Sequence, residues 1–383
     1  MTGPVGTRSS PHGWRIGSLG GIPVYLARSW PVIAILIVAL FGPTLDTGSR
    51  STVAAYLIAF GYAALLLVSV LLHEAAHALA ARWKGQRVDR VVADMWGGHT
   101  VYDATRSTPG SVAFIAVVGP LTNLLLGALG WLVLPLVTGD VATRLVDGLT
   151  WTNLLVGAFN LVPGLPLDGG QIVSALVWRV TGRRSSGLVA AGWLGRIVAL
   201  VLLVWRAVLP AVSGENSGFG VLLWVVIALF LWKGASDAIR SGPIMDATSG
   251  PVVEVLEPAI VVGVAETVDA AVGRALGQPG PVIVVVADER GRPVGTLSAE
   301  VAQSVPVAER SRTPVAAVYS VQPESWVVRL AGDATVADLV RPMVLSSLSS
   351  AVVVDGGSGR VLGVARAERM NDYIGSALER RRR

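Results

Sequence analysis

The 383-residue chain has no cysteine, so it can form neither a disulfide nor a metal site with thiolate ligands. Charged residues are also scarce, because they make up 15% of the chain, against about 25% in typical soluble domains. Hydrophobic residues make up 52% of the chain, and the mean hydropathy is +0.61. The scarcity of charge therefore indicates that a large part of the chain faces lipid.

The shortage of charge is confined to residues 29–235, whereas residues 243–383 have an ordinary density of charge. This contrast predicts a transmembrane domain over residues 1–242, followed by a soluble part. Within the first domain, apolar runs near the length that a bilayer requires predict about six transmembrane helices. The predicted spans are 29–43, 53–82, 111–137, 150–178, 188–212 and 218–234.

The basic residues lie in short segments between apolar runs, which is typical of membrane topology and not of a nucleic-acid surface. We therefore expect no nucleic-acid partner. Loops near 44–52, 138–149 and 213–217 are poor in basic residues, so both termini and the soluble part are predicted to be cytoplasmic. Lys84 and Lys233 are the only lysines, and this preference for arginine is typical of a GC-rich bacterial genome. Together with the apolar spans it predicts a protein of the bacterial cell (inner) membrane. No signal peptide is recognisable, and we expect the N-terminus to be retained.

Residues 86–110 are too polar to span a membrane, and their apolar positions alternate around Met95–Gly98 (MWGG). This pattern predicts a short membrane-associated β-hairpin at the cytoplasmic face. Non-helical backbone at that depth must be satisfied by other protein or by a water-filled cavity.

The soluble part contains an internal repeat. Residues 284–301 and 352–369 align without a gap at an offset of 68, which matches Gly291 with Gly359. Each copy has the pattern of a strand, a glycine turn, a second strand and a helix. The repeat predicts two α/β units, which we place at residues 243–310 and 311–383.

His73, Glu74 and His77 form an HExxH motif inside the second apolar run. On a helix, His73 and His77 stand one turn apart on the same face, so both imidazoles can reach one zinc ion. Glu74 can then take a proton from water bound to that ion. A role in packing alone is the alternative, but each ionisable residue inside a span costs roughly 2.5–3.5 kcal/mol, and leucine would pack without that penalty.

A catalytic zinc ion requires a third protein ligand. Asp168 is the favoured residue, because prolines and a glycine at 163–166 break the helix before it, and irregular backbone at membrane depth commonly lines a site. Its alternative role is to cap the renewed helix. His12 lies in a polar tail and is expected to be solvated, and His99 is expected at the surface or near the site.

Three motifs follow in order on apolar segments: HEAAH (73–77), NLVP (160–163) and LDGG (167–170). Together they resemble the site-2 protease family of intramembrane zinc metalloproteases. Over essentially its whole length, the chain is similar to the bacterial subgroup in which a pair of CBS domains follows the membrane core. The resemblance implies an α-helical polytopic membrane protein followed by a soluble α/β tandem CBS module.

The resemblance also implies one Zn²⁺ per chain on His73, His77 and Asp168, with Glu74 as the catalytic base. Asn123, at the end of GPLTN (119–123), would either contact substrate or form an interhelical hydrogen bond. Asn160 would either belong to the site or support the helix break. In the hairpin, Gly97 and Gly98 would help present a strand edge to unwound substrate.

The resulting hypothesis is a metalloendopeptidase, surrounded by membrane lipid, that cuts the transmembrane segment of a single-span membrane protein, such as an anti-sigma factor, in regulated intramembrane proteolysis. The CBS pair would regulate it or join two chains into a homodimer. At the ribose-binding positions of CBS modules stand Ser298, Val301, Arg366 and Arg369, which argues against an adenosine nucleotide. The alternative is a metal-ion transporter or sensor with a CBS regulatory domain, since intramembrane histidine and aspartate also mark ion pathways.

Overall fold

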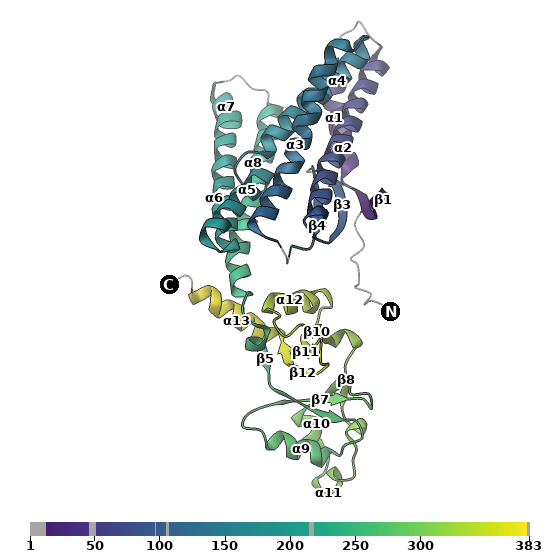
Figure 1. The fold of residues 1–383 in the computed structure, drawn as a ribbon, viewed down its shortest axis with the longest axis vertical. Coiled ribbons are helices and arrows are strands. Elements are labelled where there is room, and N and C mark those ends of the chain that lie inside the picture. Colours follow the sequence, from purple (N-terminus) through teal and green to yellow (C-terminus); the bar gives the residue numbers. More distant parts are fainter. Residues whose placement is uncertain (1–12, 46–50, 96, 105–106, 214–217, 381–383) are drawn as a thin grey trace. The chain divides into compact units, whose positions relative to one another are not determined.

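The computed structural model describes residues 13–45, 51–95, 97–104, 107–213 and 218–380 (Figure 1). It divides into two compact units, Met1–Gly242 and Pro243–Arg383. The first unit consists of long helices and one small sheet, and the second is an α/β unit.

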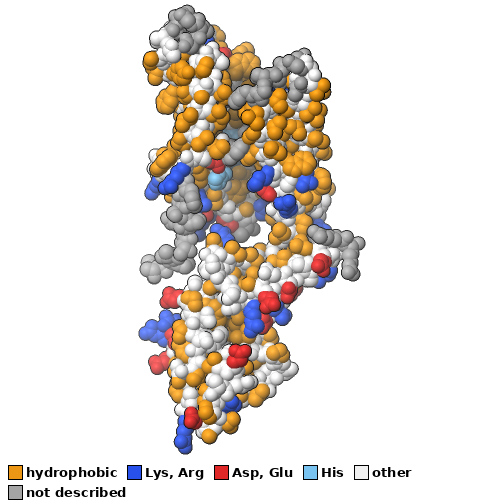
Figure 2. Space-filling model, turned by 180° about the vertical axis from the view of Figure 1, so that it is seen from behind, with side chains coloured by type: hydrophobic (Ala, Val, Ile, Leu, Met, Phe, Trp, Pro, Cys, Tyr) orange, Lys and Arg blue, Asp and Glu red, His pale blue; other side chains and the backbone are white. Residues whose placement is uncertain are grey.

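The helices of the first unit are α1 (Trp30–Leu45), α2 (Thr52–Trp83), α3 (Pro109–Val133), α4 (Asp140–Asn160), α5 (Asp168–Thr181), α6 (Arg184–Leu203), α7 (Leu209–Ser213) and α8 (Gly218–Ala247). A 3₁₀ turn (Leu134–Leu136) extends α3, and a π-helical segment (Val204–Val208) joins α6 to α7. Many large apolar side chains of these helices are exposed, and they form the orange belt of the helical unit in Figure 2. Such a surface suits lipid, and the chain is a multi-pass membrane protein.

Four helical stretches among the described residues are long and apolar enough to cross a membrane: Thr52–Trp83, Pro109–Leu136, Arg184–Val208 and Gly220–Ala247. The break predicted within the span 150–178 is confirmed, because α4 ends at Asn160 and α5 begins at Asp168. Most of the loop predicted at 138–149 is instead the first half of α4. This segment contains several charged residues, which is why the sequence predicted a loop. In the structure, Arg144 Nε lies 3.1 Å from Asp140 Oδ1 one helical turn away, and such a pair stabilises a helix.

The small sheet has the strand order β1 (Gly13–Leu19), β2 (Ile22–Ala27), β3 (Val88–Asp94) and β4 (Gly97–Tyr102). The predicted hairpin is confirmed as the antiparallel pair β3–β4. The hairpin β1–β2 was not predicted; it turns at Gly20 and Gly21, whose positive φ angles suit glycine. Ile22, Val91 and Ala78 of α2 form one buried cluster, so the sheet packs against the half of α2 that carries the HExxH motif.

The second unit contains two four-stranded sheets. The first has the order β6 (Ala259–Gly263), β7 (Ile283–Ala287), β8 (Pro293–Leu297) and β9 (Ser320–Val321), and the second has the order β10 (Val327–Leu330), β11 (Ser350–Asp355), β12 (Val361–Arg366) and β5 (Leu256–Glu257). The helices are α9 (Val268–Leu276), α10 (Ala299–Ser304), α11 (Val307–Arg310), α12 (Val336–Leu345) and α13 (Ala367–Arg380), with 3₁₀ turns at Val252–Val255, Val315–Ala317 and Glu324–Trp326. The repeat is confirmed, because Gly291 and Gly359 turn equivalent hairpins with φ angles of 75° and 73°.

One edge strand crosses between the repeats. Strand β5 precedes the first sheet in sequence but pairs with β12 of the second sheet, whereas β9 follows β8 and pairs with it. Val285, Trp326 and Val352 share one buried cluster between the repeats. The first sheet therefore covers residues 259–321.

Candidate metal centre

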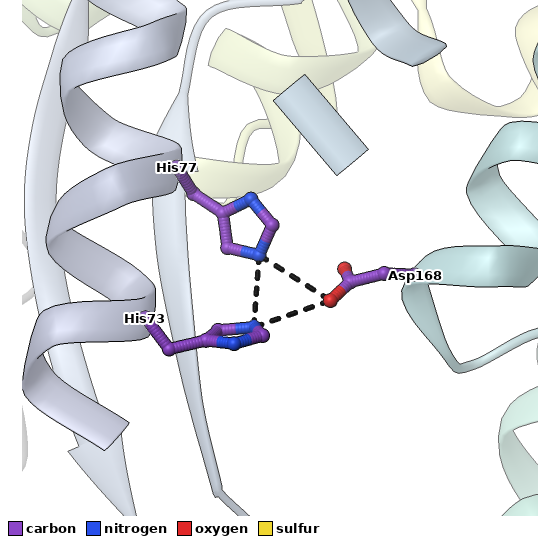
Figure 3. Close-up of side chains that lie close together, drawn as sticks. All are labelled: His73, His77 and Asp168. Atoms are coloured by element: carbon purple, nitrogen blue, oxygen red, sulfur yellow. Dashed lines mark hydrogen bonds and ion pairs between the residues drawn. The ribbon is translucent and has the colours of Figure 1, made fainter. Parts of the chain in front are cut away.

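Three side chains converge on one point in the membrane unit (Figure 3). His73 and His77 project from neighbouring turns of α2, and Asp168 is the first residue of α5. The two Nε2 atoms lie 3.0 Å apart, and Asp168 Oδ2 lies 3.1 Å from Nε2 of His73 and 3.4 Å from Nε2 of His77. Tetrahedral ligand atoms at 2.0–2.1 Å from zinc lie about 3.3 Å apart. The three separations therefore fit one zinc ion.

Hydrogen bonds to the far side of each ring determine which nitrogen faces this point. His77 Nδ1 lies 2.8 Å from the carbonyl oxygen of Ile115, and His73 Nδ1 contacts Oδ1 of Asn123. Both partners are acceptors, so Nδ1 carries the proton in each ring and Nε2 presents its lone pair. Two lone pairs and a carboxylate oxygen at such separations repel one another unless a cation lies between them. The donor set thus has the chemistry of a zinc site.

Asn123 is fully buried and connects three helices. Its Nδ2 donates to Ser69 Oγ of α2 at 2.9 Å and to Asn153 Oδ1 of α4 at 2.8 Å. The sequence left two roles open for Asn123, contact with substrate or an interhelical hydrogen bond. The structure favours the second role, because Asn123 makes interhelical hydrogen bonds, orients His73 and does not line the cavity described below. Asn153 was not predicted. The sequence pattern that could have identified Asn153 is the helical spacing of Thr150, Asn153 and Gly157, which form the buried face of α4.

Asn123→Leu is expected to weaken zinc binding by about 10–100-fold, the usual effect of removing an outer partner of a histidine ligand. The measurement is competition with a chromogenic chelator in detergent. Thr122→Val is the matched control, because the Thr122 hydroxyl bonds only to the Val118 carbonyl of its own helix. Equal zinc affinity in Asn123→Leu and wild type would contradict the positioning role.

The helix break before Asp168 is held by α6 and α8. Leu165 N donates to the Ala191 carbonyl at 3.1 Å, a side chain on Gly195 would overlap the Leu165 carbonyl, and Gly234 packs against Pro166. The N-cap of α5 is Leu167 and not Asp168, which leaves the Asp168 carboxylate directed at the histidines. Asn160 ends α4 directly before the break and does not line the cavity.

Gly119 of α3 lies against the two imidazoles. A Cβ at this position would overlap Nε2 of His77 and would lie 2.7 Å from Nε2 of His73. We expect Gly119→Ala to reduce zinc affinity at least about tenfold, because the ligands must move to admit the methyl group. Gly110→Ala in the same helix is the control, since its Cβ meets nothing within 4 Å. Chelator competition on both variants tests this, and similar affinities would refute the steric argument.

Glu74 is 5% exposed and is held by strand β4. Thr100 Oγ1 lies 2.8 Å from Glu74 Oε2 and 3.0 Å from the Glu74 carbonyl oxygen. A Cβ on Gly98 would lie 2.6 Å from Glu74 Cγ, so glycine allows β4 to approach the carboxylate. Gly97 has a φ of 125°, which glycine adopts readily, while residue 96 of the MWGG motif lies outside the described residues.

A cavity of about 220 Å³ adjoins the cluster. Its lining comes from α2, α3, β4, the helix break and α5: Glu74, His77, Gly98, His99, Thr100, Tyr102, Val112, Ile115, Ala116, Pro166, Asp168 and Gln171. His99 lines this cavity but is not among the three converging ligands. It lies 3.3 Å from Asp94 Oδ2, and the Asp94 carboxylate raises the pKa of His99. His12 lies outside the described residues.

Comparison with protein families gives a match within the membrane unit. Residues 61–148 and 138–204 match the model of peptidase family M50. The putative zinc metalloprotease Rip3 of Mycobacterium tuberculosis is 37% identical over 198 residues, 49% of each chain. The putative zinc metalloprotease sll0528 of Synechocystis sp. is 30% identical over 246 residues, 61% of each chain. The chain thus spans about half to three fifths of the length of these curated relatives.

Solved structures similar to the chain fall into two groups. The site-2 protease from Methanocaldococcus jannaschii has 24% sequence identity and a TM-score of 0.44, and the match covers 60% of this chain and 95% of that one. The CBS domain of the bacterial CNNM/CorC family Mg²⁺ transporter has 18% identity and a TM-score of 0.27, covering 42% of this chain and 96% of that one.

Proposed function

We propose that this chain is an intramembrane zinc metalloendopeptidase, because residues 61–148 and 138–204 match the model of peptidase family M50. One observation carries the proposal: His73, His77 and Asp168 converge with the spacing of three zinc ligands, and Glu74 adjoins the first of them. All four residues lie in a membrane unit that otherwise exposes apolar side chains. Such a cluster has a clear chemical use in hydrolysis and none in packing.

A bound zinc ion would lower the pKa of a coordinated water molecule towards ~7 and so supply hydroxide at neutral pH. Glu74 would take up the proton of that water and pass it to the leaving amine. Its carboxylate is suited to this task because Thr100 holds Oε2 at 2.8 Å. Asn123 and the Ile115 carbonyl would keep both imidazoles in the ligating tautomer throughout.

The proposed substrate is the transmembrane segment of a single-span membrane protein, with anti-sigma factors as a suitable class. A peptide bond inside a helix must be exposed before it can be attacked. Strand β4 lies at the edge of its sheet and lines the cavity with Gly98, His99 and Thr100. An unwound segment could add to this edge through backbone hydrogen bonds, with its peptide bond directed at the metal.

We further propose a bacterial inner membrane with the cut near the cytoplasmic side. His73 lies ten residues before the end of α2 at Trp83, which corresponds to about 15 Å along the helix. Lys84 directly follows α2, and Lys233 and Arg240 lie in the second half of α8, while Figure 2 shows basic side chains gathered below the apolar belt. Basic residues favour the cytoplasmic face, which would also place both termini there.

The α/β unit is proposed to be a CBS-type module that regulates proteolysis or joins two chains into a homodimer. An adenosine nucleotide is not favoured as its ligand. Ser298 Oγ accepts a hydrogen bond from Val301 N and caps α10, and Arg366 Nε lies 3.5 Å from Glu257 Oε1. Both side chains are therefore engaged within the unit.

Proteoliposomes that contain the purified chain and a single-span substrate test the proposal. We expect cleavage to stop when zinc is removed by a chelator and to resume when zinc is restored. Sealed liposomes loaded with a zinc indicator test the alternative of metal transport in parallel. Zinc uptake without cleavage would contradict the protease and favour the transporter.

A further inference from the structure

Arg196 of α6 carries a charge that the metal centre does not use. Its guanidinium lies between two indoles, 4.9 Å from the ring centre of Trp193 and 5.0 Å from that of Trp232 on α8. Nε and Nη2 donate to Ser236 Oγ at 3.2 and 3.0 Å, and the Ser236 hydroxyl donates to the Trp232 carbonyl. Two tryptophans and one serine thus fix the orientation of the guanidinium.

The charge of Arg196 has no counterion in the described part of the chain. Among the described residues, no carboxylate lies within ion-pair distance of the Arg196 guanidinium. Asp237, which follows Ser236 in sequence, pairs instead with Lys233 at 3.3 Å. A guanidinium has five N–H donors, and Ser236 accepts from only two nitrogens of this one. An unpaired cation beside hydrocarbon is costly, and an anion at this position would remove the penalty.

The surroundings of Arg196 suit the border between hydrocarbon and headgroups. Trp193 and Trp232 are 53% and 45% exposed, although indoles usually bury their surface in a soluble protein. On the next turn of α6, the apolar side chains of Ile197, Leu200 and Val201 are also exposed. Tryptophan with arginine next to an exposed apolar helix face is typical of the headgroup level of a bilayer.

We propose that Arg196, Trp193, Trp232 and Ser236 bind the phosphate of an anionic phospholipid. A phosphate can accept two parallel N–H bonds from one guanidinium, and the acyl chains would follow the exposed apolar face of α6. A net negative lipid is favoured over a zwitterionic one, because a choline group would compensate the phosphate and leave the arginine less well paired. The proposal does not depend on zinc or on proteolysis.

The site lies behind the helix break that presents Asp168. Gly195, the neighbour of Arg196, contacts the Leu165 carbonyl, and Gly234, two residues from both Trp232 and Ser236, packs on Pro166. The same turns of α6 and α8 therefore contact the lipid on one side and the break on the other.

Native mass spectrometry of the full chain, released from nanodiscs of equal phosphatidylglycerol and phosphatidylcholine, tests the site. Wild type is expected to retain one phosphatidylglycerol in preference, and Arg196→Gln about fivefold less. Trp193→Leu, which leaves the Arg196–Ser236 bond in place, is expected to lower retention as well. Arg240→Gln is the control, because it removes an exposed charge one turn beyond Ser236 on α8.

Retention of the lipid by Arg196→Gln and Trp193→Leu at the wild-type level would overturn the proposal, as would equal retention of the two lipids by wild type. A separate arm adds millimolar inorganic phosphate before release. We expect it to leave the lipid bound, because free phosphate lacks acyl chains. Displacement of the lipid by phosphate would assign the site to a soluble anion and would equally overturn the proposal.

Discussion

Glu74→Gln is expected to slow substrate cleavage by about 10²–10⁴-fold, the contribution of a positioned general base. Glutamine keeps the shape of glutamate and the hydrogen bond from Thr100, but it cannot accept a proton from water. Because Glu74 is not one of the three converging ligands, zinc content should stay near that of wild type. Cleavage rates in proteoliposomes and metal content by mass spectrometry measure both quantities on one preparation.

Thr100→Val provides the matched control for this experiment. It removes the hydroxyl that holds Glu74 Oε2 but leaves the carboxylate itself in place. We therefore expect a smaller loss of cleavage than in Glu74→Gln, with zinc again retained. Cleavage by Glu74→Gln at the wild-type rate would refute the role of Glu74 as base, and loss of zinc from that variant would instead indicate a fourth ligand.

Asp168→Asn is expected to weaken zinc binding by more than about 100-fold, because the loss of a ligand should exceed the loss of an outer partner. The amide is neutral, so it cannot offset the charge of the metal as the carboxylate does. Cleavage should fall with zinc occupancy. Chelator competition gives the affinity, and the cleavage rate at saturating zinc separates weak binding from a damaged site.

Asp140→Asn controls for the removal of one aspartate from the membrane unit. Asp140 is exposed at the start of α4, pairs with Arg144 and is not one of the three converging ligands. Its zinc affinity should equal that of wild type. If Asp168→Asn binds zinc as tightly as this control, then Asp168 is not the third ligand and the proposed metal centre is wrong.

The sequence predicted His73, His77 and Asp168 because each is marked by a pattern within its own segment of the chain. His73 and His77 lie at helical spacing, and the prolines before Asp168 mark a break of the kind that commonly lines a site at membrane depth. The sequence could not show how the ligands are supported. Asn153 lies within the predicted span 150–178, but its hydrogen bond with Asn123 depends on how α3 and α4 pack against each other.

The sequence also could not predict which strands pair with one another in the sheets. The hairpin β1–β2 becomes part of a sheet only through β3, which lies more than sixty residues further along the chain. In the α/β unit, the repeat located β7, β8, β11 and β12, but β5 and β9 are two residues long and carry almost no pattern. The pairing of β5 with β12 joins segments far apart in the chain, which local propensity cannot decide.

X-ray absorption at the zinc K edge of the purified full chain reports the ligands of the metal itself. We expect about one zinc per chain with only nitrogen and oxygen ligands at about 2.0–2.1 Å. The scattering of two imidazoles should be present in wild type and reduced to one in His77→Ala. A wild-type spectrum without imidazole scattering, or one that His77→Ala leaves unchanged, would contradict a zinc ion held by His73, His77 and Asp168.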